Sequence, residues 1–213
     1  MPEKLDIKNW SRKEHFMFYR SFDEPFFGLT FNVEVTEAYA HCKEAGVSFF
    51  IYYLYAALKA ANQIGEFKHR ILGDDVLVYD VVNASPTINR DNGTFGFSYM
   101  DFYEDFSVFC SKAQKEIERV RASVALVPSN DASNTIHFSA IPWVQFTSVS
   151  HARNYKFEDS IPKISFGKVF DEGNKKRMPV SVHVHHALMD GYHVGLFADY
   201  FQKALNNKFR IQD

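Results

Sequence analysis

The sequence has little of several features that each mark a particular class of protein. Its 213 residues include two cysteines, Cys42 and Cys110, which are too few for a disulfide framework and lack metal-ligand spacing. The most apolar run, residues 49–58, is far shorter than the roughly 20 residues that a membrane-spanning helix needs. A formal charge of −2 provides no basic surface for nucleic acid or acidic membranes. We therefore expect neither a membrane protein nor a nucleic-acid-binding protein.

The amino-terminal segment "MPEKLDIKNWSRKEHF" also lacks an apolar stretch, so it does not read as a signal peptide. Seven prolines and ten glycines are scattered along the chain, and we find no linker and no internal repeat. These observations predict a soluble, cytoplasmic protein in which residues 1–213 form one domain.

Apolar residues, by contrast, are plentiful. They make up 46% of the chain and include 22 Phe and 11 Tyr, which is enough for one sizeable core. Their spacing predicts strands at residues 29–35, 135–141 and 144–148 and helices that begin near Ser11, Ser48 and Asp105. Because helices and strands interleave, we expect an α/β fold, a two-layer sandwich with a mixed β-sheet.

The segment "SVHVHHALMDGYHVG", residues 181–195, holds four of the nine histidines. In a strand, residues two apart share a face, so His183 and His185 point one way while His186 shares the face of the neighbouring valines. A neutral imidazole at the end of a strand, half-walled by apolar groups, suits a general base at neutral pH. A hydrogen-bonded core histidine is the alternative interpretation of the same position.

Two other interpretations of this segment are weaker. His183 and His185 could ligate zinc, with His193 nearby, but no further ligands follow at a recognisable spacing, so we expect no metal site. Asp190 lies four residues after His186, as a catalytic partner would. It also directly precedes the last predicted helix, and capping that helix explains it more simply. Another group must then set the tautomer of His186.

The same residues resemble a known signature. "HHALMDGYHV" is similar to the His-His-x-x-x-Asp-Gly signature of CoA-dependent acyltransferases, in particular of the chloramphenicol acetyltransferase family. "NWSRKEHFMFY" resembles that family's Trp-x-Arg-Lys-Glu-His-Phe segment, "FSAIPWVQF" its Ile-Ser-x-x-Pro-Trp strand, and "KISFGK" a strand that contains threonine. In order and length the resemblance covers essentially the whole chain, and it implies the family's fold.

The resemblance implies direct transfer of acetyl from acetyl-CoA, a co-substrate, to a hydroxyl of chloramphenicol, with no permanently bound cofactor. His186 matches the catalytic base, whose tautomer is held in the family by a hydrogen bond from Nδ1 to its own carbonyl oxygen. Ser139 matches the serine that stabilises the oxyanion, and Arg12 and Asp190 match a buried structural ion pair. The chemistry is consistent, because a hydroxyl of high pKa needs a base and the developing oxyanion needs a donor.

The resemblance also implies the surroundings of the site. Phe18, Tyr19 and Phe95 match residues that line the acceptor pocket, and Trp143 matches a residue beside the CoA channel. Ser165 stands where the family has threonine, and its hydroxyl could still hold a water. The family forms homotrimers with each active site between two subunits, and its partners are acetyl-CoA and a small hydroxyl-bearing acceptor.

Three positions of the acceptor pocket depart from the family pattern. Asp23, Val127 and His151 fall where the drug-acetylating enzymes usually carry Leu, Phe and Leu, which makes the pocket more polar. The sequence therefore supports three hypotheses: acetylation of chloramphenicol, the same reaction on a more polar hydroxyl acceptor, or a non-catalytic ligand-binding relative. Intact His186 and Ser139 favour an enzyme.

Overall fold

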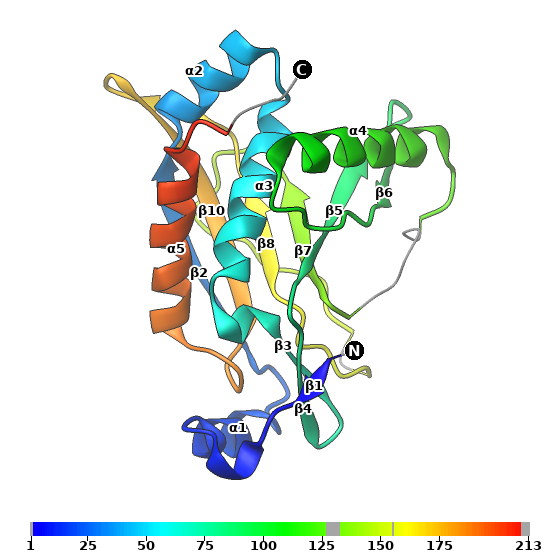
Figure 1. The fold of residues 1–213 in the computed structure, drawn as a ribbon, viewed down its shortest axis with the longest axis vertical. Coiled ribbons are helices and arrows are strands. Elements are labelled where there is room, and N and C mark those ends of the chain that lie inside the picture. Colours follow the sequence, from blue (N-terminus) through cyan, green and yellow to red (C-terminus); the bar gives the residue numbers. More distant parts are fainter. Residues whose placement is uncertain (1, 127–132, 155, 210–213) are drawn as a thin grey trace.

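The computed structural model describes residues 2–126, 133–154 and 156–209 (Figure 1). Its helices are α1 (Lys13–Tyr19), α2 (Thr36–Ala45), α3 (Phe49–Asn62), α4 (Phe106–Ala122) and α5 (Gly191–Leu205), with short 3-10 helices at Ile7–Asn9 and Gly65–Lys68. Its strands are β1 (Glu3–Lys4), β2 (Phe26–Glu34), β3 (His69–Leu72), β4 (Asp75–Val78), β5 (Asn83–Asn89), β6 (Phe95–Phe97), β7 (Thr135–Ala140), β8 (Lys163–Phe166), β9 (Phe170–Glu172) and β10 (Lys175–His185).

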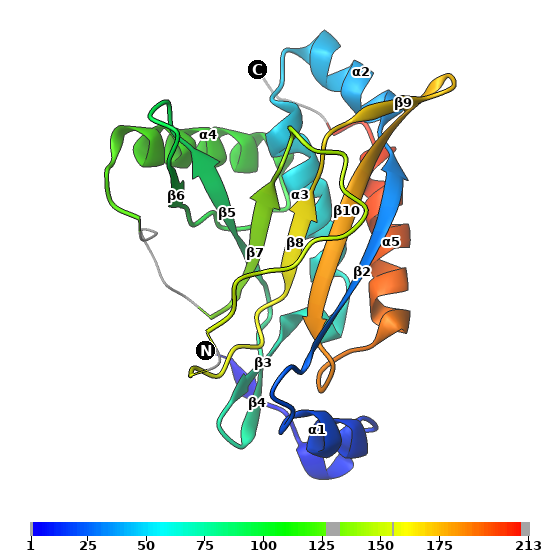
Figure 2. The ribbon, with the colours of Figure 1, turned by 180° about the vertical axis from the view of Figure 1, so that it is seen from behind.

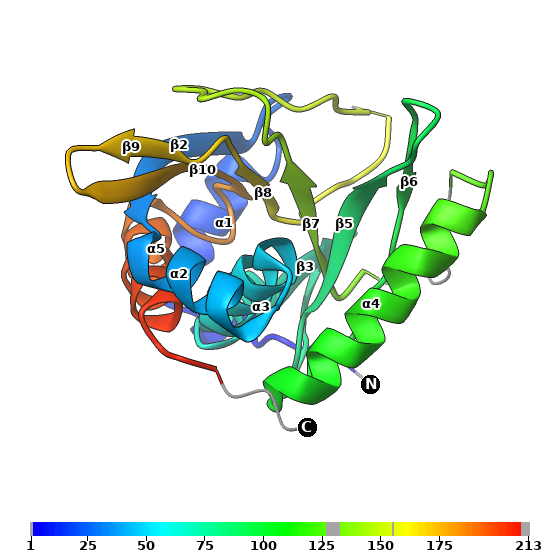
Figure 3. The ribbon, with the colours of Figure 1, turned by 90° about the horizontal axis from the view of Figure 1, so that it is seen from above.

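The large sheet has the strand order β2-β10-β8-β7-β5-β6, and β9 pairs with β10 beside this path. Strand β10 is antiparallel to both β2 and β8, whereas β8, β7 and β5 run parallel to one another. Helices α2, α3, α4 and α5 lie on one side of this sheet (Figure 3). The predicted α/β two-layer sandwich with a mixed sheet is confirmed.

Helix α3 lies at the centre of the helical layer, and its apolar residues surround it almost completely. Ten of its side chains are buried, which agrees with its all-round apolarity. Beneath it, Val180, Val182 and Val184 of β10 are fully buried in the same core. Because side chains alternate along a strand, Ser181 and His183 point to the opposite face. No helix within the described ranges is long and apolar enough to span a bilayer.

Among the described residues, the connection between β7 and β8 (residues 141–154 and 156–162) crosses the opposite face of the sheet (Figure 2). We call this face of the sheet the open face. A strand was predicted within this connection at 144–148, and that prediction is wrong. Strand β7 already has β5 and β8 as neighbours, so no free edge of the sheet lies beside it. The alternating residues therefore lie in irregular backbone over the open face.

Local capping signals identified several helix starts. Ser48 Oγ accepts from the backbone N–H of the third residue of α3, and the Asp105 carboxylate does the same for α4. The first helix begins close to the predicted position, at Lys13, but Arg12 rather than Ser11 occupies its N-cap. The guanidinium of Arg12 makes no capping bond and instead reaches Asp190.

Candidate active site

The strand register aligns polar side chains of the open face in two adjacent rows. The first, which we call the hydroxyl row, consists of Ser139, Ser165 and Ser181 on β7, β8 and β10. The second, which we call the basic row, consists of His137, Lys163 and His183 on the same strands. Each basic residue lies two positions from a serine, so both rows share one face and lie about 7 Å apart.

The three hydroxyls of the first row differ in their surroundings. Ser165 is fully buried, and its Oγ has no hydrogen-bonding partner among the described residues. Ser181 is also buried, with its Oγ 3.4 Å from Nδ1 of His183. Ser139 is half-buried and lies near the carboxyl end of β7. Ser139 is therefore the hydroxyl of this row that a ligand on the open face can reach.

His186 lies one residue beyond β10 and is held by two aromatic rings. Its imidazole stacks on Tyr19, with ring centroids 4.0 Å apart and planes 9° from parallel, and Phe27 packs at 4.6 Å. Its backbone N–H donates to the carbonyl of Pro25. These contacts fix the ring at the end of the strand, where the sequence predicts the base.

The hydrogen bond expected from His186 Nδ1 to its own carbonyl oxygen is not formed. Nδ1 is buried and has no partner among the described residues, whereas the carbonyl oxygen accepts from Nη2 of Arg12 at 3.4 Å. The carbonyl oxygen is thus bonded to Arg12 rather than to Nδ1 of its own residue. Ring stacking, rather than that hydrogen bond, orients the imidazole.

Asp190 joins a chain of alternating charges. Its carboxylate lies 2.5 Å from Nη1 of Arg12 and accepts from the N–H of Tyr192, so it caps α5. It also lies 3.0 Å from Nδ1 of His193, whose Nε2 is 3.4 Å from Glu66. The capping interpretation is confirmed. Within the described residues no group of three or more His, Cys, Asp or Glu is arranged to hold a metal.

Burial disfavours the charged forms of Asp190, His193 and Glu66, but the hydrogen bonds and charges of their neighbours favour those forms more strongly. Desolvation alone would raise the pKa of Asp190, yet the hydrogen bond from Arg12 brings that pKa below its usual value. Burial would likewise lower the pKa of His193, whereas Glu66 raises it above the ordinary value. The hydrogen bond from His193 in turn lowers the pKa of Glu66 to about 2. The charged forms of all these groups are mutually stabilised.

His186 and Ser139 are far apart within one chain. Ser139 is level with Ser165, which is level with Ser181, so it lies two strands from β10. His186 follows Ser181 by five residues, which is roughly 16 Å along the strand, and two strand spacings add roughly 10 Å across the sheet. One chain therefore does not bring the predicted base and the predicted oxyanion donor to the same reacting atom.

The residues predicted to line the acceptor pocket are likewise divided. Phe18 packs on Tyr19 with ring centroids 5.0 Å apart, so both lie beside His186. Phe95 is 44% exposed on β6, the last strand in the order of the sheet, and packs on Phe97. The apolar part of the predicted pocket thus lies on two separate regions of the molecule.

The positions that depart from the family pattern have different locations. His151 lines a cavity on the open face, whereas Asp23 is exposed and lines an adjoining cavity. Val127 lies outside the described residues. Trp143, predicted beside the CoA channel, is 66% exposed just after β7.

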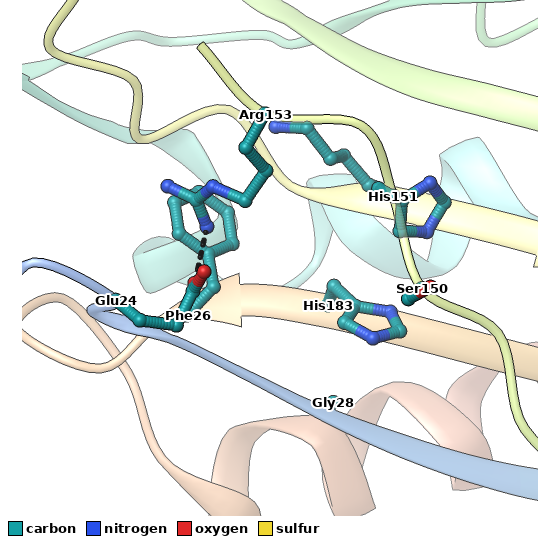
Figure 4. Close-up of a pocket in the computed structure, with 8 residues that line it drawn as sticks. Glu24, Phe26, Gly28, Ser150, His151, Arg153 and His183 are labelled. Atoms are coloured by element: carbon teal, nitrogen blue, oxygen red, sulfur yellow. Dashed lines mark hydrogen bonds and ion pairs between the residues drawn. The ribbon is translucent and has the colours of Figure 1, made fainter. Parts of the chain in front are cut away.

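The cavity that contains His151 has a volume of about 220 Å³ (Figure 4). Its lining comes from residues 24–28, from residues 150–153, and from Lys163 and His183 of the basic row. Sequence reasoning missed the charged members of this lining. The alternation of side chains along a strand could have indicated two of the lining residues. Lys163 and His183 each lie two positions from a serine of the hydroxyl row and therefore share its face of the sheet.

Comparisons with known proteins agree with the fold and identify the family. The profile of the chloramphenicol acetyltransferase family matches residues 2–202. Chloramphenicol acetyltransferase 3 of Escherichia coli is 31% identical over 210 residues, which cover 97% of this chain and 98% of that protein. The chloramphenicol acetyltransferase of Clostridium butyricum is 32% identical, with 96% and 98% covered.

Solved structures show the same relationship. A chloramphenicol acetyltransferase superposes with a TM-score of 0.87 at 32% identity, over 97% of this chain and 100% of that one. A dihydrolipoamide acetyltransferase of Azotobacter vinelandii, with a TM-score of 0.65 at 14% identity over 85% and 81%, shares the fold. With its signature histidine seated between aromatic rings at the end of β10, the chain belongs to the chloramphenicol acetyltransferase family and is an acyltransferase.

Proposed function

We propose that the protein transfers acetyl from acetyl-CoA directly to a hydroxyl acceptor, with chloramphenicol as the leading acceptor. The names of its relatives support the donor, the reaction and this acceptor. The proposal rests on one observation: His186 packs between Tyr19 and Phe27 at the end of β10, and the half-buried hydroxyl of Ser139 lies on the open face. We further propose that residues 1–213 act as one domain in the cytoplasm, where Cys42 and Cys110 stay reduced.

In this mechanism His186 takes the proton from the acceptor hydroxyl while its oxygen attacks the thioester carbonyl. Because Nδ1 is buried, Nε2 is the nitrogen that acts as base. Ser139 donates to the oxyanion of the tetrahedral intermediate, a contribution of about 3 kcal/mol when well aimed. Collapse of the intermediate releases the thiol of CoA, which regains the proton from His186. The exposed ring of Trp143 contacts CoA. Because the acceptor hydroxyl attacks the thioester directly, no acyl-enzyme forms.

We also propose a homotrimer in which each site lies between two subunits. The separation of Ser139 and His186 within one chain supports this, since a second copy can supply the residue that the first cannot bring near. Sedimentation tests the assembly. A stable species of 24.6 kDa, the mass of one chain, would contradict both the trimer and the shared site.

A second candidate function is the same reaction on a more polar hydroxyl acceptor. The polar lining of the open-face cavity, with His151 among its residues, favours it. A third hypothesis, a non-catalytic ligand-binding relative, has no equivalent observation. A thiol-release assay with acetyl-CoA separates the three: release with chloramphenicol supports the first, release only with other alcohols the second, and no release with any acceptor the third.

A further inference from the structure

The open-face cavity lies directly beside the hydroxyl row. Lys163 and His183 of its lining are each two positions from Ser165 and Ser181, which is about one pleat repeat of 7 Å. A small acceptor can therefore direct its hydroxyl toward Ser139, the reachable hydroxyl of that row, and place another group in the cavity. The chemistry of that second group is set by the side chains of the cavity.

Two cations lie close to one aromatic ring in the wall of this cavity. The guanidinium carbon of Arg153 lies 3.6 Å from the centre of the Phe26 ring, and Nζ of Lys163 lies 4.7 Å from it. Arg153 also bonds Glu24 at 3.0 Å (Figure 4). The two cations reach the ring from separate segments, residues 150–153 and β8, and both line the cavity.

Lys163 is a buried ammonium that does not use all of its N–H donors within the protein. It is 8% exposed, and it donates to Asp159 at 2.6 Å and to the carbonyl of Ile161 at 3.0 Å. These bonds use two of its three N–H groups. The third has no hydrogen-bond acceptor among the described residues, so it can donate to a bound anion without breaking the pair with Asp159.

Two imidazoles complete the lining. His151 and His183 meet edge to face, with ring centroids 4.8 Å apart, and Nε2 of His151 is buried without a partner among the described residues. Burial is the main reason that the pKa of His151 is lowered to about 4, and the neighbouring His183, Lys163 and Arg153 contribute to the same shift. Burial and the same two cations also lower the pKa of His183, although the Glu24 carboxylate opposes them. Both imidazoles therefore favour the neutral form beside the two cations.

Gly28 leaves room for this arrangement. It is the register partner of His183 on β2, and a Cβ at this position would clash with the imidazole ring. A larger residue at 28 would force His183 out of its position in the cavity wall.

From these contacts we propose that the cavity binds a carboxylate of the acceptor, so that the protein acetylates hydroxyl compounds that carry a carboxylate. Arg153 and Lys163 bind the carboxylate through charge-assisted hydrogen bonds, and the imidazoles add neutral donors. This inference rests on the proposed acetyltransferase function, and it develops the second candidate, transfer to a more polar hydroxyl acceptor, rather than transfer to chloramphenicol. It names the charge of the acceptor that the open-face cavity selects.

A matched pair of probes tests the charge preference. N-acetyl-L-serine and N-acetyl-L-serinamide carry the same primary hydroxyl and differ in the carboxylate. We expect kcat/KM for the carboxylate to exceed that for the amide by at least tenfold in the unaltered protein, and Arg153→Met to lower this ratio at least tenfold, mainly through KM. The control Arg177→Met removes another arginine paired with a carboxylate, Glu172, at the opposite end of β10, and leaves the ratio unchanged.

The outcomes separate this inference from the proposed function. Transfer that favours the amide or chloramphenicol, or a ratio that Arg153→Met leaves intact, overturns the carboxylate site while the acetyltransferase remains. If no acceptor releases CoA thiol, the proposed function fails, and calorimetric binding of the two probes then decides the site. Preferential binding of N-acetyl-L-serine that Arg153→Met abolishes supports the site, and equal binding of both probes overturns it.

Discussion

At the scale of single residues, the four histidines of residues 181–195 occupy four environments. His186 is stacked on Tyr19, and His185 is 4% exposed, with its Nδ1 accepting from a backbone N–H. His183 lines the open-face cavity, and His193 lies between two carboxylates. One histidine therefore has the setting of a base, and the others have structural or binding roles.

Replacing His186 with Ala should remove the general base. We expect kcat to fall about 10²–10⁴-fold with little change in CoA affinity, because the base contacts the reacting hydroxyl rather than the carrier. Steady-state kinetics and CoA titration measure both. His41→Ala on α2, which loses a contact to the carbonyl of residue 209, serves as control and should retain activity. Equal losses in the two variants would contradict the assignment.

Replacing Asp190 with Asn should reduce stability more than Ser139→Ala does. The change leaves the charge of Arg12, whose side chain is 11% exposed, without its carboxylate, and it weakens the cap of α5. We expect the free energy of unfolding to fall by about 3 kcal/mol, toward the low end for buried pairs because Asp190 is a third exposed. Denaturant unfolding measures the difference. An Asp190→Asn protein as stable as Ser139→Ala would refute the pairing.

His185 should make stability depend on pH. Burial lowers its pKa to about 4, whereas an unfolded chain has the ordinary value near 6.5. Between these values the unfolded state binds more protons, so stability falls as pH drops from 6.5 toward 4, by up to about 1.4 kcal/mol per pH unit. Unfolding at a series of pH values should give a shallower slope for His185→Gln. An unchanged slope would mean that His185 is not the group that titrates.

At the scale of helices and strands, short sequence patterns predicted the features that depend on neighbouring residues, such as helix caps. The caps at Ser48 and Asp105 follow from side chains that bond N–H groups three residues away, and both were predicted. The N-cap of the first helix differs from the prediction by one residue, Arg12 in place of Ser11. The strand at 144–148 failed because β7 has no free edge, which periodicity alone does not reveal.

The same distinction applies to the site. His186 and Asp190 belong to one short signature, so their proximity was visible in the sequence. The charged lining of the open-face cavity was not, since Glu24, Arg153 and Lys163 come from three segments that meet only through strand register and the connection over the sheet. Long-range register is set by packing of the whole sheet.

Gly28→Ala tests the geometry of the β2–β10 pair. A Cβ at 28 clashes with the imidazole of His183, so the substitution must displace the ring or the strand. We expect a loss of about 1–3 kcal/mol in unfolding free energy, as for other overpacked sites, and a higher acceptor KM with CoA binding retained. Gly65→Ala is the control, since no atom lies within 4 Å of its added Cβ. Equal behaviour of both variants would contradict the close approach.

At the scale of the whole molecule, the sheet keeps the two predicted catalytic groups apart. Ser139 lies on the open face two strands from β10, and His186 lies beyond the end of β10. A direct transfer needs both groups at one reacting carbonyl, within hydrogen-bond reach. We therefore propose that each active site draws His186 from one subunit and Ser139 from another.

Mixing two inactive variants tests this claim most directly. His186→Ala and Ser139→Ala proteins, each refolded alone, should have little activity. Refolded together in equal amounts, they should form trimers in which about a quarter of the sites combine an intact His186 with an intact Ser139 from the neighbour, as random assembly requires. Thiol release with acetyl-CoA and an active acceptor should then recover to about a quarter of that of the unaltered protein. A mixture no more active than the average of its two components would show that one chain supplies both groups, and would refute the shared site.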